Sequence, residues 1–200
     1  MDKSKYYRAD RMYMIGFILC AALFILGCVA GAIASGALPP ETPINEYASS
    51  IAGAAGRGFG SRFLSELRIS GKFYALTVFF ALSVLGAVAI PAILALRGFL
   101  LCFAVTSVIR RLGTPGVPYA LMLFAPEALI ALPGLFLLST HSMVSSVTLL
   151  RLCMSRGAIS EQPYGGVFIR RVALCAAIVC MSALIDAVVA PWLTVHFPIA

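Results

Sequence analysis

Residues 73–109 read FYALTVFFALSVLGAVAIPAILALRGFLLCFAVTSVI, and Arg97 is the only charged side chain in this run. As one α-helix the run would measure about 55 Å, whereas the hydrocarbon core of a bilayer is ~30 Å thick. Pro91 has no amide hydrogen and clashes with the preceding turn, and Gly86 lies just over one turn before it. The sequence therefore predicts a helical hairpin that breaks between Gly86 and Pro91.

The composition indicates a membrane protein. Hydrophobic residues make up 61% of the 200 residues and charged residues 12%. A soluble domain of this size exposes too much surface to hide so large an apolar fraction. We expect a single integral membrane domain over residues 1–200, an all-α polytopic bundle in contact with lipid. The formal net charge of +7 does not indicate nucleic-acid binding, because the basic residues cluster at the ends of apolar segments.

The apolar segments and the charge pattern predict about five crossings. The N-terminal tail and the basic connector 151–171 both carry excess Lys and Arg, which places both on the cytoplasmic side. Both can lie there only if the hairpin crosses twice, so we expect the N-terminus inside and the C-terminus outside. The predicted spans are 12–35, 72–90, 91–111, 117–140 and 172–192. The first is too long for the core of a secretory signal.

Prolines interrupt the fourth span, which contains Pro118, Pro126 and Pro133. A single straight helix is therefore not expected there. Beyond residue 140 apolar residues continue at helical spacing, which predicts that the helix leaves the membrane and extends toward Arg151 and Arg156.

The connector 44–71 is predicted to form an amphipathic helix at the membrane interface. Phe59, Phe63 and Leu67 recur at positions i, i+4 and i+8, with charged residues elsewhere around the helix. One interpretation is a helix that caps the bundle. The other is a docking surface for a partner or for anionic lipid, with these three side chains at its centre.

Small residues mark the candidate positions of close helix packing. Gly27 and Gly31 form a GxxxG motif in the first span. Gly86, Pro91 and Gly98 are the corresponding candidates in the hairpin. The six cysteines show no CxxC spacing, and five of them lie in apolar runs, so we interpret them as small packing residues with reduced thiols.

Three charged residues lie within predicted spans and away from the span ends: Arg97, Glu127 and Asp186. An ionised side chain at mid-membrane costs several kcal/mol unless it is paired or faces water. The sharper hypothesis is a polar network in which Arg97 bridges one or both carboxylates. The alternatives are that Arg97 and Asp186 snorkel to an interface, or that the charges line a proton or ion pathway.

Enzyme signatures are missing from the sequence. It contains no HExxH, GxSxG or Walker A motif, and the Gly-rich stretch Gly56–Ser61 lacks the lysine of a phosphate loop. We expect no catalytic activity, no metal site and no cofactor.

Four stretches of this chain together resemble the stage II sporulation protein M family. They are Gly27 to Gly31; Gly86-Ala-Val-Ala-Ile-Pro91 followed by Leu96-Arg97-Gly98-Phe99; Phe124-Ala-Pro-Glu127 followed by Leu132-Pro133; and Asp186-Ala-Val-Val-Ala-Pro191-Trp192. The resemblance covers nearly the whole chain. Its pattern is fairly specific, because glycine, proline and charge must all fall at set distances within apolar helices.

The resemblance implies a scaffold in the cell membrane of a spore-forming bacterium. Members of this family act with stage II sporulation proteins D and P, which degrade peptidoglycan during engulfment of the forespore, and hold them in place. No catalytic residue is carried over. A transporter or permease-like subunit is the alternative, because interrupted helices and buried charge often line substrate sites. Self-association is left open.

Overall fold

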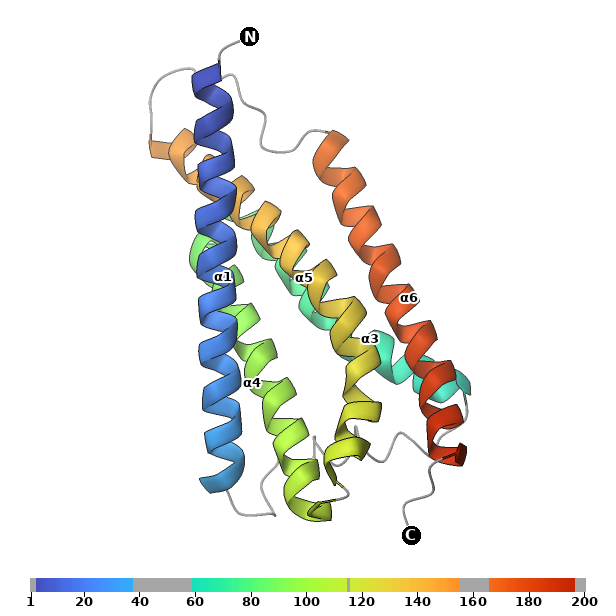
Figure 1. The fold of residues 1–200 in the computed structure, drawn as a ribbon. Helices are drawn as coiled ribbons and strands as arrows, with labels where there is room; N and C mark the ends of the chain where they lie inside the picture. The colour runs from blue at the N-terminus through green and yellow to red at the C-terminus, as the bar shows by residue number, and fades with distance from the viewer. Residues whose placement is uncertain (1–2, 38–58, 115, 155–165, 197–200) are drawn as a thin grey trace.

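Five long helices form the bundle in the computed structural model, which describes residues 3–37, 59–114, 116–154 and 166–196 (Figure 1). They are α1 (Lys3–Ala37), α3 (Phe59–Ala81), α4 (Gly86–Leu112), α5 (Gly116–Met154) and α6 (Gly166–His196). No strand occurs in these ranges. The protein is therefore an all-α helical bundle, as the composition predicts.

The run 73–109 folds back on itself, but the break lies earlier than predicted. α3 ends at Ala81 and α4 begins at Gly86, so the turn is Leu82–Leu85. A Cβ at position 86 would collide with the carbonyl oxygen of Phe80, which means that only glycine permits so tight a return. The prediction of a break between Gly86 and Pro91 was wrong, because Pro91 lies inside α4 and the helix continues through it.

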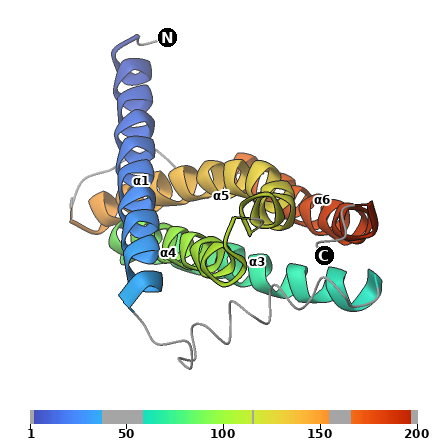
Figure 2. The same cartoon turned by 60° about the horizontal axis from the view of Figure 1, so that its bottom comes forward.

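The helices alternate in direction along the chain, so the Lys3 end of α1 and the His196 end of α6 lie at opposite ends of the bundle (Figure 1). Viewed toward one end, α3 and α4 form one layer and α5 and α6 form a second (Figure 2). α1 packs across the side where α4 and α5 meet. This arrangement makes α1 and α4 a parallel pair.

α5 is one continuous helix of 39 residues. It bends along its length but does not break at its three prolines (Figure 1). Prolines are tolerated in membrane helices because neighbouring helices and side-chain hydroxyls satisfy the freed backbone groups. The predicted continuation beyond residue 140 is confirmed as far as Met154.

Three helices in the described ranges are long and apolar enough to cross a bilayer. They are Arg11–Ala37, Gly86–Arg111 and Ala128–Met154, and the outer faces of these helices expose large apolar side chains such as Ile33 and Val88. The count of five crossings stays a prediction. α3 runs without interruption across the predicted boundary between the connector 44–71 and the span 72–90, so these are not separate elements from Phe59 onward. Residues 44–58 lie outside the described ranges.

Two clusters of buried side chains form the core. The larger one joins all five helices and consists of Cys20, Tyr74, Ile90, Leu94, Leu135, Leu138, Cys175 and Val179. The smaller one joins α4 and α5 near the turn between them and includes Phe103 and Phe124. All six cysteines are free thiols, and Cys20 and Cys175 pack in the core as predicted, whereas Cys153 and Cys180 are exposed.

Candidate functional site

The closest helix contact is a seam between α1 and α4, made by Gly27, Gly31 and Gly98. A Cβ on Gly27 would collide with the carbonyl of Ala95, and one on Gly31 with the carbonyl of Phe99. Gly98 returns the contact from α4, where a Cβ would lie 3.0 Å from the ring of Phe24. The missing side chains allow the two backbones to touch. We call these three residues the glycine seam.

Polar contacts close the seam at the last turn of α1. The hydroxyls of Ser35 and Ser107 lie 3.1 Å apart, and both side chains are buried. Arg110 donates a hydrogen bond from Nη1 to the carbonyl of Ser35 at 3.0 Å. The last carbonyls of a helix lack partners within it and favour a positive charge nearby. Arg110 of α4 therefore caps α1.

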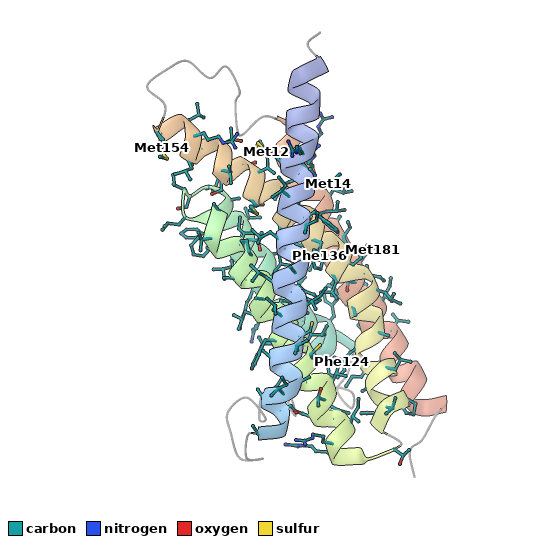
Figure 3. All side chains as sticks on the ribbon, turned by 60° about the vertical axis from the view of Figure 1, so that its left-hand side comes forward. Met12, Met14, Phe124, Phe136, Met154 and Met181 are labelled. Atoms are coloured by element: carbon teal, nitrogen blue, oxygen red, sulfur yellow. The ribbon has the colours of Figure 1, made fainter. Side chains whose placement is uncertain are left out.

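Aromatic rings extend the contact of α1 to α5. Phe136 of α5 lies beside α1 (Figure 3). The centroid of its ring is 5.9 Å from that of Phe17 and 5.2 Å from that of Phe24, both on α1. Phe24 is also the residue against which Gly98 packs. The first helix is thus held by α4 and α5 together.

The turn between α3 and α4 is held by a serine that the sequence did not single out. Ser146 of α5 donates to the carbonyl of Ser83 at 2.7 Å and lies 3.3 Å from the carbonyl of Val84. Both carbonyls follow the end of α3, where the helix no longer supplies donors. Gly86 makes room for this hydroxyl, because a Cβ there would lie 2.9 Å from Ser146 Oγ.

Arg97 lies inside the bundle with 5% of its surface exposed. Its Nη2 lies 3.4 Å from the hydroxyl of Ser70, which is also buried, and its guanidinium carbon is 5.0 Å from the centroid of the Phe73 ring. Such an arrangement combines a hydrogen bond with a cation–π contact. Arg97 therefore joins α4 to α3, and its burial argues against snorkelling to a lipid headgroup.

The side chains of Glu127 and Asp186 lie outside the described part of the structure, so the predicted network with Arg97 stays a prediction. Contacts between α3, α5 and α6 do fix how deep in the bundle the main chain of Glu127 and Asp186 lies. The hydroxyl of Tyr74 donates to the carbonyl of Ala131 at 2.7 Å. One turn earlier on these two helices, which run in the same direction, come Ser70 and Glu127.

The contact of α5 with α6 gives the level of Asp186. Gly134 packs against Ile178, and Arg171 binds His141, which shows that the two helices run antiparallel. Seven residues before Gly134 is Glu127, and eight residues after Ile178 is Asp186. The main chain at both acidic positions thus lies near the level of Ser70, the partner of Arg97.

Tyr74 and His141 form polar contacts between helices that the sequence did not predict. Gly134 admits the Tyr74 hydroxyl, which would lie 2.8 Å from a Cβ at that position. Arg171 Nη1 lies 2.8 Å from Nδ1 of His141, whose ring meets Tyr13 edge-on at 5.0 Å. Arginine has no acceptor, so His141 accepts at Nδ1 and carries its proton on Nε2. For the contact of Tyr74 with α5, the one signal in the sequence is Gly134, a small residue that leaves room for a large side chain.

The three predicted docking residues do not share one environment. Phe59 is exposed by 52%, whereas Phe63 is half-buried and Leu67 packs against the larger core cluster. Of the three, only Phe59 is largely available to a partner. In the described ranges no group of His, Cys, Asp and Glu side chains is arranged to hold a metal ion.

The sequence matches the model of a known protein family over most of its length. The family model for Stage II sporulation protein M matches residues 20–191. No curated protein sequence and no solved structure gives a significant match. The matched range contains the glycine seam, the hairpin, Arg97, Glu127 and Asp186, and it covers well over half of the chain. The chain therefore belongs to the Stage II sporulation protein M family.

Proposed function

We propose that this chain is a membrane scaffold that holds peptidoglycan-degrading proteins in place during engulfment of the forespore. The observation that carries the proposal is the family match over residues 20–191. The partners that the family implies are stage II sporulation proteins D and P. The long apolar helices support a role within the membrane, and the proposal assigns no catalytic step to the chain.

We also propose that the protein is located in the cell membrane, with its N-terminus in the cytoplasm. The alternating directions of the five helices support an odd number of crossings (Figure 1). Arg151 contacts Met12 of α1, and Arg171 contacts His141, whose ring meets Tyr13 of α1. These basic residues and the adjacent Arg170 thus lie toward the end of the bundle where α1 begins, which favours the same side of the membrane for the N-terminus and the connector 151–171.

Co-purification tests the scaffold role. The full-length tagged chain is isolated in mild detergent from sporulating cells, and the D and P proteins are measured in the eluate. We expect both proteins with the unmodified chain, and their absence would refute the partnership. Phe59→Ala tests the exposed part of the predicted docking face, with Ile33→Ala on the outer face of α1 as the matched control. Equal recovery with both variants would exclude Phe59 from the docking surface. Leu67 is unsuited to this test because its loss would disturb the core.

A pathway for protons or ions is the second candidate function. It is favoured by the buried hydroxyls of Ser139, Ser142 and Ser182, which have no hydrogen-bond partner among the described residues, together with buried Arg97. Buried polar groups are normally paired, so such hydroxyls are suited to bind water or a cation. A proton or potassium flux into vesicles containing the chain, lost in Ser142→Ala, would support it. A proton and potassium flux no larger than that into vesicles without the protein would exclude this function.

A further inference from the structure

The outer face of α3 carries two positive charges within an apolar row. Leu64, Arg68, Lys72 and Leu76 follow each other at four-residue intervals, and all four are exposed. Residues at this spacing lie on one face of a helix. We call these four residues the basic stripe. Phe79, also exposed, continues the apolar surface toward the turn.

Contacts of α3 place the centre of the stripe near the middle of the bundle's depth. Lys72 lies between Ser70, which binds Arg97, and Tyr74, which binds Ala131. Arg97 is eleven residues after Gly86 and fourteen before Arg111, the two ends of a candidate span. These separations correspond to about 16 Å and about 21 Å along α4.

The helices α5 and α6 give the same depth independently. Ala131 is fifteen residues after the start of α5, or about 22 Å along it. Ile178 of α6 packs against Gly134, which lies about one turn from Ala131 on α5. Ile178 is eight residues beyond Arg170, or about 12 Å along α6. Lys72 is therefore far from both ends of the apolar helices that pack against α3.

Exposed charge at this depth is costly in lipid. An exposed Lys or Arg at the centre of a membrane helix is strongly disfavoured and is usually paired or facing water. Neither Arg68 nor Lys72 has a hydrogen-bond or ion-pair partner among the described residues. The exposed large side chains of α1 and α6 at comparable depth are apolar, such as Ile25 and Met181. Among the described side chains, the exposed charge at this depth therefore lies on one face of α3.

A second observation shows that a helix can approach this face closely. Gly71 lies beside the basic stripe, and a Cβ built there would meet nothing within 4 Å. Ala75 follows one turn later and is exposed. Beside each glycine of the glycine seam, a neighbouring helix occupies the space that a side chain would take, whereas beside Gly71 this space is open. Small residues four apart are typical of helix contacts in membranes.

We propose that the basic stripe binds, within the membrane, a helix of another protein that carries an aspartate or glutamate at mid-depth. A carboxylate there would neutralise Arg68 and Lys72, and its helix would pack on Leu64, Leu76 and the open side of Gly71. A second copy of α3 would bring the same charges together. Lipid phosphates lie about 15 Å or more from the bilayer centre. The proposal does not depend on the sporulation role, so either can fail alone.

The test uses the full-length chain, with a fluorescent protein at one terminus, in phosphatidylcholine vesicles. The probes are labelled synthetic transmembrane peptides of leucine and alanine with a central Asp, Leu or Lys, and association is measured by energy transfer. We expect the Asp peptide to bind about tenfold more tightly than the Leu peptide, equivalent to ~1.4 kcal/mol. The variant R68Q/K72Q should lose this preference, and R68E/K72E should transfer it to the Lys peptide. Arg170→Gln, which neutralises an exposed arginine on α6, is the matched control and should keep it.

Three results would overturn the proposal. Equal binding of the Asp and Leu peptides would mean that the two charges reach water by themselves. Loss of the Asp preference on adding phosphatidylglycerol would identify anionic lipid as the occupant. Efficient cross-linking of two chains through Lys72→Cys in a background lacking the native cysteines would identify a second copy. Circular dichroism of each variant checks that the helices are intact.

Discussion

Replacing Gly27 with alanine gives a sharp test of the glycine seam. The added Cβ would lie 2.8 Å from the carbonyl carbon of Ala95 and closer still to its oxygen. Carbon atoms in ordinary contact are ~3.5–4.0 Å apart, so α1 and α4 must separate locally by about 1 Å. Overpacking of this kind costs ~1–3 kcal/mol. The better helix propensity of alanine returns at most about 1 kcal/mol.

A matched control separates the packing cost from the propensity gain. Gly71→Ala makes the same chemical change inside a helix, but its Cβ meets nothing within 4 Å. We expect Gly71→Ala to leave the free energy of unfolding unchanged or to raise it by up to about 1 kcal/mol. Gly27→Ala should fall below this control by about 2 kcal/mol. Gly31→Ala should cost less free energy of unfolding in the Gly27→Ala background than in the unmodified chain, because one separation of the helices relieves both clashes.

The assay is unfolding of the purified chain in mixed micelles of mild detergent and dodecyl sulfate, followed by circular dichroism. The free energies are compared at equal detergent composition, without any partner peptide present. If Gly27→Ala were as stable as Gly71→Ala, the backbones of α1 and α4 would not be in contact at this position.

Four further predictions follow from other contacts. Tyr74→Phe should lower the free energy of unfolding by ~0.5–1.5 kcal/mol, because the carbonyl of Ala131 loses a buried hydrogen bond; Tyr119→Phe, whose hydroxyl has no partner among the described residues, should change it little. Ser146→Ala should speed amide hydrogen exchange in the turn Leu82–Leu85, whereas Thr148→Val, which removes a hydroxyl bound within its own helix, should not. If Arg97 pairs with Glu127, Arg97→Leu should cost ~3–5 kcal/mol and Glu127→Gln should recover part of it, while strictly additive effects would contradict the network. Reporter fusions to the two termini should report opposite sides of the membrane, and the same side for both would contradict five crossings.

The helical class and the return of the chain at 73–109 could be predicted because they depend on composition and length. The position of the turn could not, because two features compete for it within one apolar run. Pro91 is the stronger local breaker, yet the turn forms where Gly86 passes the carbonyl of Phe80 and where Ser146 supplies a donor. Ser146 is sixty residues further along the chain, so local pattern contains no trace of it.

The glycines of the candidate packing set were identifiable because small residues at fixed spacing have few other uses in an apolar helix. Which helix they meet was not, since Gly31 faces a helix 68 residues further on at Phe99. Periodicity likewise placed Phe59, Phe63 and Leu67 on one face of α3, but it does not say what covers that face. In the fold Leu67 turns toward the core, and the most unusual exposed face is the neighbouring one that carries Arg68 and Lys72.

The pairing of α1 with α4 also sets an order of events during synthesis. Gly98 is made 67 residues after Gly31, so the first helix leaves the ribosome and enters the membrane well before its partner exists. In that interval a bare groove along α1 faces lipid or the insertion machinery. A nascent chain halted before α4 would therefore display an unfilled glycine surface, open to membrane proteases or to the helix of another protein.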